Sequence, residues 1–523
     1  MHLLHVPLFS ALILLGISIH SSSSAKIGIF VAPVSNSIVL YVIRLAEILT
    51  ADGHQVVIIR PTFNPNATKL VSKNPKIREI RLEPLESHEY FENFTAVEKT
   101  IIYGNDSFFD YIPFGTVFNK MKNAACEGMV KNKEFLDGLR NEKFDMAFTH
   151  HMSTCEIGII HHLGISRWVR YMPGVPSKFF LDSCGEFAPS PLVHSFFHAS
   201  EPHKTFLQRL RDLLVNAFSL VGTVIDERNL NAIFRQNIDP NFPSIDSLKY
   251  TSSLCLINSN KYIDYPVGVS NKIIWTGGLE GEVEKRHLDQ NLQEFVNNAQ
   301  RLVFFSFGSV TIASEMPQEW KEAIIELFKS NPTIHFIWKF EEEIEIPLNV
   351  YRTKWAPQAE ILAHEKTVAF VTHGGYSSLM ETISAGKPCL AVPLFADQYR
   401  NAELLQYRGL SITIEKNQLT QHGFLNEQFQ RLLKDEEYEK AAKRLRDLVK
   451  NQPNSIAKDI VFGVDLVLKG TVPLGLPPYS FIELYSLDVV FLLVVTFFFL
   501  RIVLPCYHWS CCKMAFKEKV KFE

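Results

Sequence analysis

Histidine, serine and glycine residues in the last third of the chain are spaced so that they could bind an anion. His373-Gly374-Gly375 follows the apolar stretch 368–372, and Ser377 and Ser378 come next. The glycines predict a tight turn and residues 376–384 predict a helix. A strand, a glycine turn and a helix start present free backbone N–H groups and the positive end of a helix dipole at one point. The imidazole and the hydroxyls can donate hydrogen bonds there, which suits a pyrophosphate.

Neighbouring residues suit the remainder of a nucleotide sugar. Glu381 lies one helical turn further on, where its carboxylate can accept hydrogen bonds from ribose hydroxyls. Upstream, Trp355 can stack on a base and Gln358 can bond the base through its amide. Together with Gly375 in the turn, these positions predict a nucleotide-sugar pocket. The alternative is an ordinary buried βαβ unit in which the polar residues are incidental.

The order and spacing of these residues resemble the signature of the UDP-glycosyltransferases, the family that includes the UDP-glucuronosyltransferases. The shared pattern is Trp-x-Pro-Gln at residues 355–358, His-x-Gly at 373–375 with Glu381 eight residues after the histidine, and Pro-x-x-x-Asp-Gln-x-x-Asn-Ala at 393–402. A long ordered motif of this kind is far more specific than a single glycine loop. The similarity extends from Lys26 onward and is stronger in the second half of the chain.

The resemblance assigns further residues to the donor site. Asp397 and Gln398 are expected to bind hydroxyls of the sugar, and Ser309, in the loop 307–309, is expected to touch the donor phosphates. A plain β-turn at Ser309 and a solvent-facing loop at Asp397 are the alternatives. UDP-sugar is then a co-substrate. No cofactor and no metal site are expected, because no Asp-x-Asp motif follows a strand in the sequence.

The resemblance also implies a fold and a reaction. The expected fold class is α/β, with two doubly wound Rossmann-like domains of the GT-B type plus a C-terminal transmembrane helix. The expected reaction is inverting, metal-independent transfer of a sugar, glucuronate or glucose, from a UDP-sugar to a small lipophilic acceptor. Both sugars fit the motif equally, and homo-oligomerisation is left open.

Alternating apolar strands and helices agree with two α/β regions. Strands are expected at 26–32, 55–59, 144–148, 302–307 and 334–338, and helices at 38–49 and 318–330. Because ligands of such sheets bind at the carboxyl ends of the strands, we expect them in the cleft between the two regions. The predicted division is a signal peptide at 1–25, an acceptor-binding domain at 26–280, a UDP-sugar donor-binding domain at 281–450, a C-terminal segment packing back toward the membrane at 451–486, a transmembrane helix at 487–507 and a cytoplasmic tail at 508–523.

The sequence departs from the family at the catalytic pair. The resemblance implies a histidine base in the first βα loop and an orienting aspartate after a later strand. The matching positions are Ile38, or Val39 with one gap, and His150. Neither Ile nor Val can take a proton. Three interpretations follow: an active transferase whose base is His150 or His151, an active transferase for acceptors that need no base, such as amines or acidic phenols, or a UDP-sugar-binding protein without transferase activity.

Both ends of the chain predict a membrane protein of the secretory pathway. The apolar run 8–19 followed by Ser23 and Ala25 predicts a signal peptide cleaved after Ala25, with an uncleaved anchor as the alternative. The charge-free run 489–500 is extended by apolar residues beyond Arg501, and lysines follow. Lys519 and Lys521 have the dilysine spacing that returns membrane proteins to the endoplasmic reticulum.

Glycosylation sites and cysteines fit this topology. Sequons start at Asn66, Asn93 and Asn105, so the prediction is a single-pass type I protein of the endoplasmic reticulum membrane with a lumenal body. Three of the eight cysteines flank the span and could be palmitoylated: Cys506, Cys511 and Cys512. The five others show no metal-ligand spacing, and their odd number leaves at least one thiol unpaired: Cys126, Cys155, Cys184, Cys255 and Cys389.

The charge balance and the glycine pattern exclude two other classes of protein. Charge is balanced, with 53 Lys and Arg against 56 Asp and Glu, so bulk attraction of nucleic acid is not expected. An NAD-dependent oxidoreductase would need Gly-x-Gly-x-x-Gly after the first strand. The loop after that strand contains Pro33 and no glycine after Gly28.

Overall fold

The structure, a computed structural model, describes residues 24–32, 35–61, 70–83, 88–104, 110–152, 154–186, 188–189, 193, 204–279, 288–472 and 481–501. The chain divides into two units, Met1–Leu474 and Gly475–Glu523. Residues 1–23 of the predicted signal peptide, the sequons at Asn66 and Asn105, and the tail cysteines and lysines lie outside the described residues.

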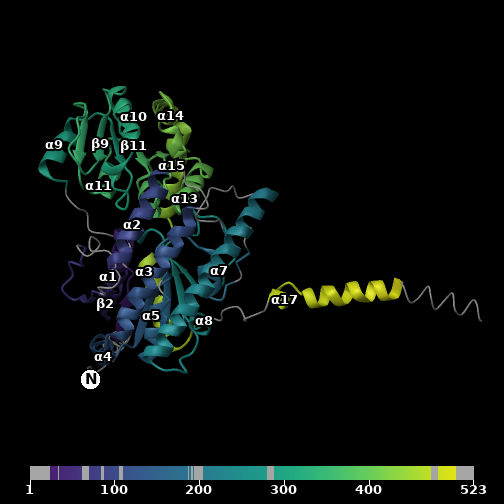
Figure 1. The fold of residues 1–523 in the computed structure, drawn as a ribbon. Helices are drawn as coiled ribbons and strands as arrows, with labels where there is room; N and C mark the ends of the chain where they lie inside the picture. Colours follow the sequence, from purple (N-terminus) through teal and green to yellow (C-terminus); the bar gives the residue numbers. More distant parts are fainter. Residues whose placement is uncertain are drawn as a thin grey trace, which may run out of the picture. The chain divides into compact units, whose positions relative to one another are not determined.

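The first α/β region is a seven-stranded sheet in the order β3-β2-β1-β4-β5-β6-β7, and every pair is parallel. Its strands are β1 (Lys26–Phe30), β2 (Gln55–Pro61), β3 (Arg78–Leu82), β4 (Met146–His150), β5 (Trp168–Met172), β6 (Leu254–Ile257) and β7 (Ile273–Trp275). Its helices are α1 (Asn36–Ala51), α2 (His88–Tyr103), α3 (Tyr111–Lys131), α4 (Lys133–Glu142), α5 (Cys155–His162), α6 (Lys178–Ser183), α7 (Phe206–Asn237) and α8 (Ile245–Lys249) (Figure 1).

The second region is a six-stranded parallel sheet in the order β10-β9-β8-β11-β12-β13. Its strands are β8 (Leu302–Ser306), β9 (His335–Lys339), β10 (Val350–Thr353), β11 (Thr367–Thr372), β12 (Cys389–Ala391) and β13 (Ser411–Thr413). Its helices are α9 (Gln290–Asn298), η5 (Ala313–Glu315), α10 (Gln318–Lys329), α11 (Gln358–Ala363), α12 (Tyr376–Ala385), α13 (Gln398–Tyr407), η6 (Lys416–Gln418), α14 (Phe424–Lys434) and α15 (Glu436–Lys450). The prediction of two doubly wound α/β regions is confirmed, and the boundary predicted after residue 280 lies outside the described residues.

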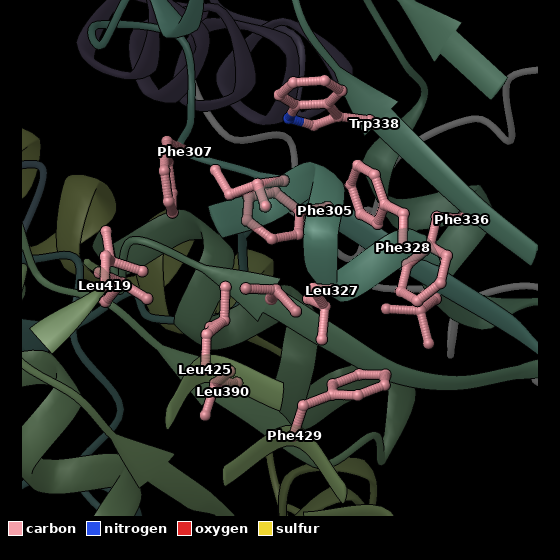
Figure 2. Packing of buried hydrophobic residues seen from close by; sticks show 14 of the residues in the cluster. Phe305, Phe307, Leu327, Phe328, Phe336, Trp338, Leu390, Leu419, Leu425 and Phe429 are labelled. Atoms are coloured by element: carbon pink, nitrogen blue, oxygen red, sulfur yellow. The ribbon is translucent and has the colours of Figure 1, made fainter. Parts of the chain in front are cut away.

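Strand residues of the second sheet alternate between two cores. Phe305 and Phe307 pack with Trp338 under α10 and α14, and Figure 2 shows this aromatic cluster. Phe304, one residue along β8, packs on the opposite face with residues of α12 and α15. Because both faces are buried, the strands are apolar throughout, as expected for a parallel sheet covered by helices. The loops after the strands are thereby fixed on a rigid base.

The last helix of the first unit returns to the first sheet. α16 (Ile456–Lys469) buries Ile460 and Val464 in the same core as α1. A Cβ added at Gly463 would lie 2.2 Å from Ile274 Cδ1 of β7, so the glycine allows close approach of the helix. Residues 456–469 of the segment 451–486 thus pack on the first α/β region, and the expected packing of that segment toward the membrane stays a prediction.

Four of the five body cysteines are paired. Cys126 is bonded to Cys155, and Cys184 is bonded to Cys255. Cys389 is free and buried in β12. The prediction that at least one of these five thiols stays unpaired is confirmed.

The second unit contains α17 (Phe481–Leu484) and a helix over 487–501. No helix within the described part of the chain is both long and apolar enough to cross a membrane. The helix predicted to span a membrane at 487–507 is therefore not found there, and its last six residues lie outside the described residues.

A buried ion pair joins the two α/β regions. Asp264, in the turn after β6, pairs with Arg400 of α13, and their side chains are 1% and 2% exposed. The Asp264 carboxylate also accepts hydrogen bonds from the Ser259 hydroxyl and from the Tyr265 N–H at 2.7 Å. Arg408, the C-cap residue of α13, donates to the carbonyl of Ile263 at 2.7 Å. The turn 259–265 is thus fastened to α13 by charge and by backbone hydrogen bonds.

We expect Arg400→Ala to lower the free energy of unfolding by about 3–5 kcal/mol, because Asp264 would be left charged and buried without its partner. The matched control is Arg446→Ala, which breaks a surface pair with Asp447 whose side chains are 38% and 56% exposed. That change should cost no more than about 1 kcal/mol. Chemical denaturation measures both values, and equal losses at the two sites would contradict the prediction.

Candidate active site

The predicted donor residues gather at the carboxyl end of the second sheet. β8 and β11 are neighbours, with Ser306 paired to Thr372 at their last residues. The loops that follow, 307–309 and 373–375, therefore leave the sheet side by side. α12 begins immediately after the second loop, with Gly375 as its N-cap residue. The free N–H groups at the start of α12 and the positive end of its dipole meet both loops.

The His373 ring is held between two glycine backbones. A Cβ added at Gly308 would lie 2.5 Å from His373 Cε1 and Nε2, and one added at Gly375 would lie 2.6 Å from Nε2. Gly308 has a φ of +84°, which also favours glycine. No other residue fits either position without displacing the imidazole. The glycines of both loops thus fix the orientation of His373, the residue predicted to bind a phosphate.

His373 is neutral in this environment. Its Nδ1 atom is buried and has no hydrogen-bond partner among the described residues. Burial, and secondly the charge of Lys339, lower the pKa of His373 to about 4. A nearby anion would oppose both effects and raise this pKa. In the free site the neutral imidazole can donate or accept a hydrogen bond. When an anion binds, the imidazole is expected to gain a proton.

Three of the predicted residues form one hydrogen-bonded cluster. Gln358, the first residue of α11, donates through Nε2 to Glu381 Oε2 at 2.7 Å and to Ser378 Oγ at 2.9 Å. The sequence suggested Gln358 as a ligand of the base and Glu381 as a ligand of the ribose, and the two side chains contact each other directly. Trp355 lies in the preceding loop and is 50% exposed. Ser377 is half-buried and Ser309 is exposed at the loop tip.

Asp397 and Gln398 lie at the start of α13, where they have different surroundings. The Gln398 side chain is 4% exposed, and its Oε1 accepts from the N–H groups of Leu394 at 2.9 Å and Phe395 at 3.2 Å. Its amide oxygen therefore holds the loop instead of pointing to solvent. Asp397 accepts from Asn401 Nδ2 at 2.9 Å, and burial raises the pKa of Asp397. The carboxylate is the more accessible of the two for a sugar hydroxyl.

The loop before Asp397 has an unusual backbone. Ala396 has a φ of +54°, a region that residues with a Cβ rarely adopt. Such positions cost energy and persist where the surrounding contacts fix them, as the two hydrogen bonds to Gln398 do here. The bend directs Asp397 to the same edge of the sheet as the His373 loop.

The two positions of the expected catalytic pair are both buried. Ile38 lies in the first turn of α1, is 8% exposed and packs in the core of the first sheet. His150 is the last residue of β4 and is 0% exposed. Its Nδ1 accepts from the Met152 N–H at 3.2 Å. The family pattern places the orienting residue at the end of a strand. His150 therefore occupies the expected position in the fold.

His150 is poorly suited to act as a base. Burial, followed by the charges of Arg170 and Lys122, lowers the pKa of His150 to about 3. The pKa of His151, whose ring centroid lies 4.4 Å away, is also lowered well below its usual value, again chiefly by burial. Two neutral, weakly basic imidazoles accept a proton poorly at neutral pH. The suggestion that His150 is a relocated base is therefore not supported by its environment.

An aromatic cluster lies beside the first βα loop. Phe94 of α2 packs against Phe114 and Phe118 of α3, with ring centroids 5.1 and 5.6 Å apart, and Ala32 after β1 belongs to the same cluster. Glu98 lies one helical turn beyond Phe94 on α2, and burial raises the pKa of Glu98 to about 7. A carboxyl group that titrates near neutrality next to an apolar cluster was not anticipated from the sequence.

Sequence reasoning also missed the residues that join the two regions. From the sequence, Tyr376 could have been a residue that only packs in the core. In the structure its hydroxyl accepts a hydrogen bond from the Asn260 N–H at 3.0 Å. Lys416 is 7% exposed and donates to the carbonyls of Ile101 at 2.7 Å and Leu394 at 3.1 Å. The C-terminal end of a helix attracts a cation. The role of Lys416 therefore depends on the end of α2 lying beside it, which the sequence does not show.

A separate groove shares none of the donor residues. It has a volume of about 490 Å³ and lies between β7 and α16, lined among others by Trp275 and Phe462. Its rim includes Asn260, which bonds Tyr376 at the start of α12. The motif residues and not this groove therefore define the candidate site.

Comparison with known proteins decides the family. The profile described as "UDP-glucoronosyl and UDP-glucosyl transferase" matches residues 28–521. The chain belongs to the UDP-glycosyltransferase family. Human UDP-glucuronosyltransferase 1A6 is 25% identical over 517 residues, which cover 94% of this chain and 92% of that protein. UDP-glucosyltransferase 2 of Dactylopius coccus is 27% identical over 428 residues, 77% of this chain and 80% of that protein.

Solved structures show the same fold. The glycotransferase of kitacinnamycin superimposes with a TM-score of 0.57 at 14% identity, covering 85% of this chain and 99% of that chain. The fold is thus the GT-B arrangement of two parallel Rossmann-like sheets. The resemblance inferred from the motif is confirmed, and the protein is a UDP-glycosyltransferase similar to the UDP-glucuronosyltransferases.

Gly375→Ala should weaken UDP binding to this UDP-glycosyltransferase at least about tenfold while leaving the protein folded. The φ of Gly375 is −58°, which alanine adopts freely, so the effect would come from displacement of the His373 ring. Gly138→Ala in α4 is the matched control, because a Cβ there meets nothing within 4 Å. Calorimetric titration with UDP measures both affinities. Unchanged UDP affinity in Gly375→Ala would show that the ring does not contact the nucleotide.

The affinity for UDP-glucose should rise as the pH is lowered from 7.5 to 5. The pKa of His373 is about 4 in the free site, and a bound pyrophosphate should raise it, so binding takes up a proton below the bound-state pKa. Titrations in two buffers of different ionisation enthalpy measure this uptake. His373→Gln should abolish it and weaken binding about 10- to 100-fold, since hydrogen bonds to charged groups contribute about 1.5–3 kcal/mol. Proton uptake that persists in the variant would contradict the assignment.

Proposed function

We propose that this UDP-glycosyltransferase transfers glucuronate or glucose from a UDP-sugar to a small lipophilic acceptor, with inversion at the anomeric carbon and without a metal. The observation that carries the proposal is the packing of His373 between the 307–309 and 373–375 loops at the start of α12. In the reaction, an acceptor oxygen or nitrogen forms a bond to the anomeric carbon while the bond from that carbon to the pyrophosphate oxygen breaks. UDP leaves with the bonding electrons, and the proton of an acceptor that is not already ionised passes to water.

Donor binding would divide among the clustered residues as follows. The N–H groups of α12 and the His373 imidazole stabilise the charge that develops on the leaving pyrophosphate. Glu381, already bonded to Gln358, accepts from ribose hydroxyls, and Trp355 stacks on the uracil. Asp397 accepts from a sugar hydroxyl. The aromatic cluster of Phe94, Phe114 and Phe118 supports a lipophilic acceptor, because apolar rings favour burial of apolar surface.

The missing base restricts the acceptors. General-base assistance contributes roughly 10²–10⁴ in rate. Ile38 cannot supply it, and the buried His150 is a weak base. A neutral amine has a free lone pair, and an acidic phenol is partly ionised at neutral pH, so both can attack without assistance. An aliphatic alcohol keeps its proton at neutral pH and attacks far more slowly without a base. The alternative, a UDP-sugar-binding protein without transferase activity, follows from the same substitutions.

We also propose that the body lies in the lumen of the endoplasmic reticulum, tethered by the C-terminal apolar segment. The signal-peptide pattern, the sequons and the dilysine spacing support this location. Two disulfide bonds in the body support it further, because disulfides persist in oxidising compartments.

Amines and acidic phenols should be glycosylated about 10²–10⁴ times faster than simple alcohols of equal size, because only the alcohols need a base. Initial rates of UDP release from UDP-glucuronate and UDP-glucose with matched acceptor series measure this ratio. Ile38→His combined with His150→Asp should raise the alcohol rate and leave the amine rate nearly unchanged.

Equal rates for alcohols and phenols in the unmodified protein would overturn this acceptor prediction. His150→Ala and Glu98→Gln would then locate the base, because only loss of the true base removes alcohol transfer while UDP binding persists. No transfer to any acceptor, with UDP-sugar binding intact, would favour the binding protein over the enzyme.

A further inference from the structure

Arg170 of β5 is a buried cation that leaves hydrogen-bond donors unused. The residue is 3% exposed, and its Nη2 atom donates to the His151 carbonyl at 3.0 Å. The Nε and Nη1 atoms are buried and have no hydrogen-bond partner among the described residues. The Phe180 ring lies 5.9 Å from the guanidinium, but a ring face accepts such donors only weakly. Because buried charges are normally paired, this guanidinium has donors left for an anion.

The acidic residues Asp226 and Glu227 of α7 are already paired with lysines. Asp226 Oδ2 accepts from Lys122 Nζ of α3 at 3.0 Å, and Glu227 Oε1 accepts from Lys249 Nζ of α8 at 2.8 Å. Burial lowers the pKa of Arg170 to about 10, and the charge of Glu227 offsets only part of this effect. Each of the two carboxylates has its own lysine. Arg170 is therefore the cation of this group that has no carboxylate partner in the part of the chain that the structure describes.

Two histidines add unused donors beside Arg170. His150 ends β4, the strand next to β5, and its ring centroid lies 4.4 Å from that of His151. His150 Nδ1 accepts from the Met152 N–H at 3.2 Å, so the neutral ring carries its proton on Nε2. This Nε2 atom, like His151 Nδ1, is buried without a hydrogen-bond partner among the described residues. Burial lowers the pKa of both imidazoles most, and the charges of Arg170 and Lys122 lower both further, so the local field favours an anion.

These three residues, Arg170, His150 and His151, form an Arg170 cluster that lies next to the aromatic cluster. Lys122 Nζ donates to the Met152 carbonyl at 3.5 Å and lies 5.2 Å from the centroid of the Phe118 ring. Phe118 belongs to the aromatic cluster. The loop after β4 and the aromatic cluster thus share one lysine as neighbour. A ligand with an apolar body and an anionic end fits the two clusters together.

We propose that the Arg170 cluster binds the carboxylate of a lipophilic carboxylic acid, and that this acid is an acceptor of the sugar. Arg170 presents two unused donors, which suit the two oxygens of a carboxylate, and His150 Nε2 supplies a third donor. The aromatic cluster receives the apolar body of the acid. The acceptor role rests on the proposed sugar transfer, whereas the carboxylate site rests on the contacts of the cluster alone.

A carboxylate suits a transferase that has no general base. At neutral pH a carboxylic acid is ionised, so one of its oxygens can attack the anomeric carbon without losing a proton. That oxygen forms the new bond while the bond to the pyrophosphate oxygen breaks, and UDP takes the bonding electrons. The product is an ester, a 1-O-acyl sugar. Because no proton is transferred, Ile38 at the position of the base is no obstacle.

The second departure from the family pattern agrees with the same substrate class. An aspartate at position 150 would hold a negative charge within the cluster that receives the carboxylate, and like charges in a buried site repel strongly. A histidine there is neutral or cationic and can donate a hydrogen bond. Ile38 and His150 therefore both fit an acceptor that arrives as an anion.

Binding of 3-phenylpropionate to the full chain in lipid nanodiscs tests the site. The amide 3-phenylpropionamide has the same size without the charge, and acetate has the charge without the apolar body. With UDP bound, 3-phenylpropionate should bind at least about tenfold more tightly than either, as measured by calorimetric titration. With UDP-glucuronate or UDP-glucose it should release UDP and give a product that hydroxylamine cleaves, because hydroxylamine cleaves acyl esters of sugars.

Arg170→Gln should weaken 3-phenylpropionate binding about 10- to 100-fold, because the carboxylate loses a charge-assisted pair. His150→Asp should weaken it at least about tenfold by repulsion, and this variant keeps the buried arginine in place. Arg167→Gln is the matched control, because Arg167 is exposed just before β5, and it should leave the binding unchanged. Each variant should keep its affinity for UDP and for 3-phenylpropionamide, which shows that the fold is intact.

Equal affinities for 3-phenylpropionate and its amide, or equal losses in Arg170→Gln and Arg167→Gln, would overturn the carboxylate site. Acetate that binds as tightly as 3-phenylpropionate would overturn the acceptor role in favour of a site for a free anion. UDP release with amines and phenols but not with 3-phenylpropionate would overturn the acceptor role alone. Binding that depends on Arg170, without UDP release from any acceptor, would contradict the proposed sugar transfer and leave the carboxylate site in place.

Discussion

The parallel direction of every strand pair is the constraint on which the site depends. In a parallel sheet all carboxyl ends lie at one edge, so residues far apart in sequence leave the sheet together. Ser306 and Thr372 end neighbouring strands, and the loops after them bring Gly308 and His373 into contact. Antiparallel pairing of the same strands would send these loops to opposite edges. The parallel strand order therefore brings the loops of the site together, whichever residues those loops contain.

The second requirement is space, which two glycines provide. His373 can stand between the loops only because neither Gly308 nor Gly375 has a Cβ. The same close packing removes water from the imidazole and lowers the pKa of His373 to about 4. The ring is consequently neutral before an anion arrives. Close packing thus accounts for the orientation of the ring and for most of its reduced basicity, to which the charge of Lys339 adds.

Local features of the site could be predicted from the sequence, because they depend on local rules. A glycine turn followed by a helix start can be recognised from residue types alone, and α12 begins at Tyr376 as expected. The odd number of body cysteines similarly predicted at least one free thiol, and Cys389 is free. The pairing of the other four could not be predicted, since it depends on which helices meet.

Burial and long-range contacts were not predictable from residue types. A histidine after a strand has the same sequence whether it is solvated or, like His150, fully buried with a pKa near 3. The packing of α16 against β7 and the exposure of the apolar side of α7 also depend on tertiary contacts. Gln398 shows the same limit: its motif position suggested a sugar ligand, while its amide oxygen holds the loop backbone.

Helix α2 connects the two halves of the reaction. Near its middle, Phe94 belongs to the aromatic cluster beside the first βα loop. At its end, the Tyr103 hydroxyl donates to the Ile312 carbonyl at 2.6 Å, in the segment that follows Ser309, and Lys99 pairs with Glu315 at 2.8 Å. Lys416 then neutralises the negative end of the helix dipole through the Ile101 carbonyl. α2 therefore contacts both the aromatic cluster and the segment 312–315, which follows the loop beside His373.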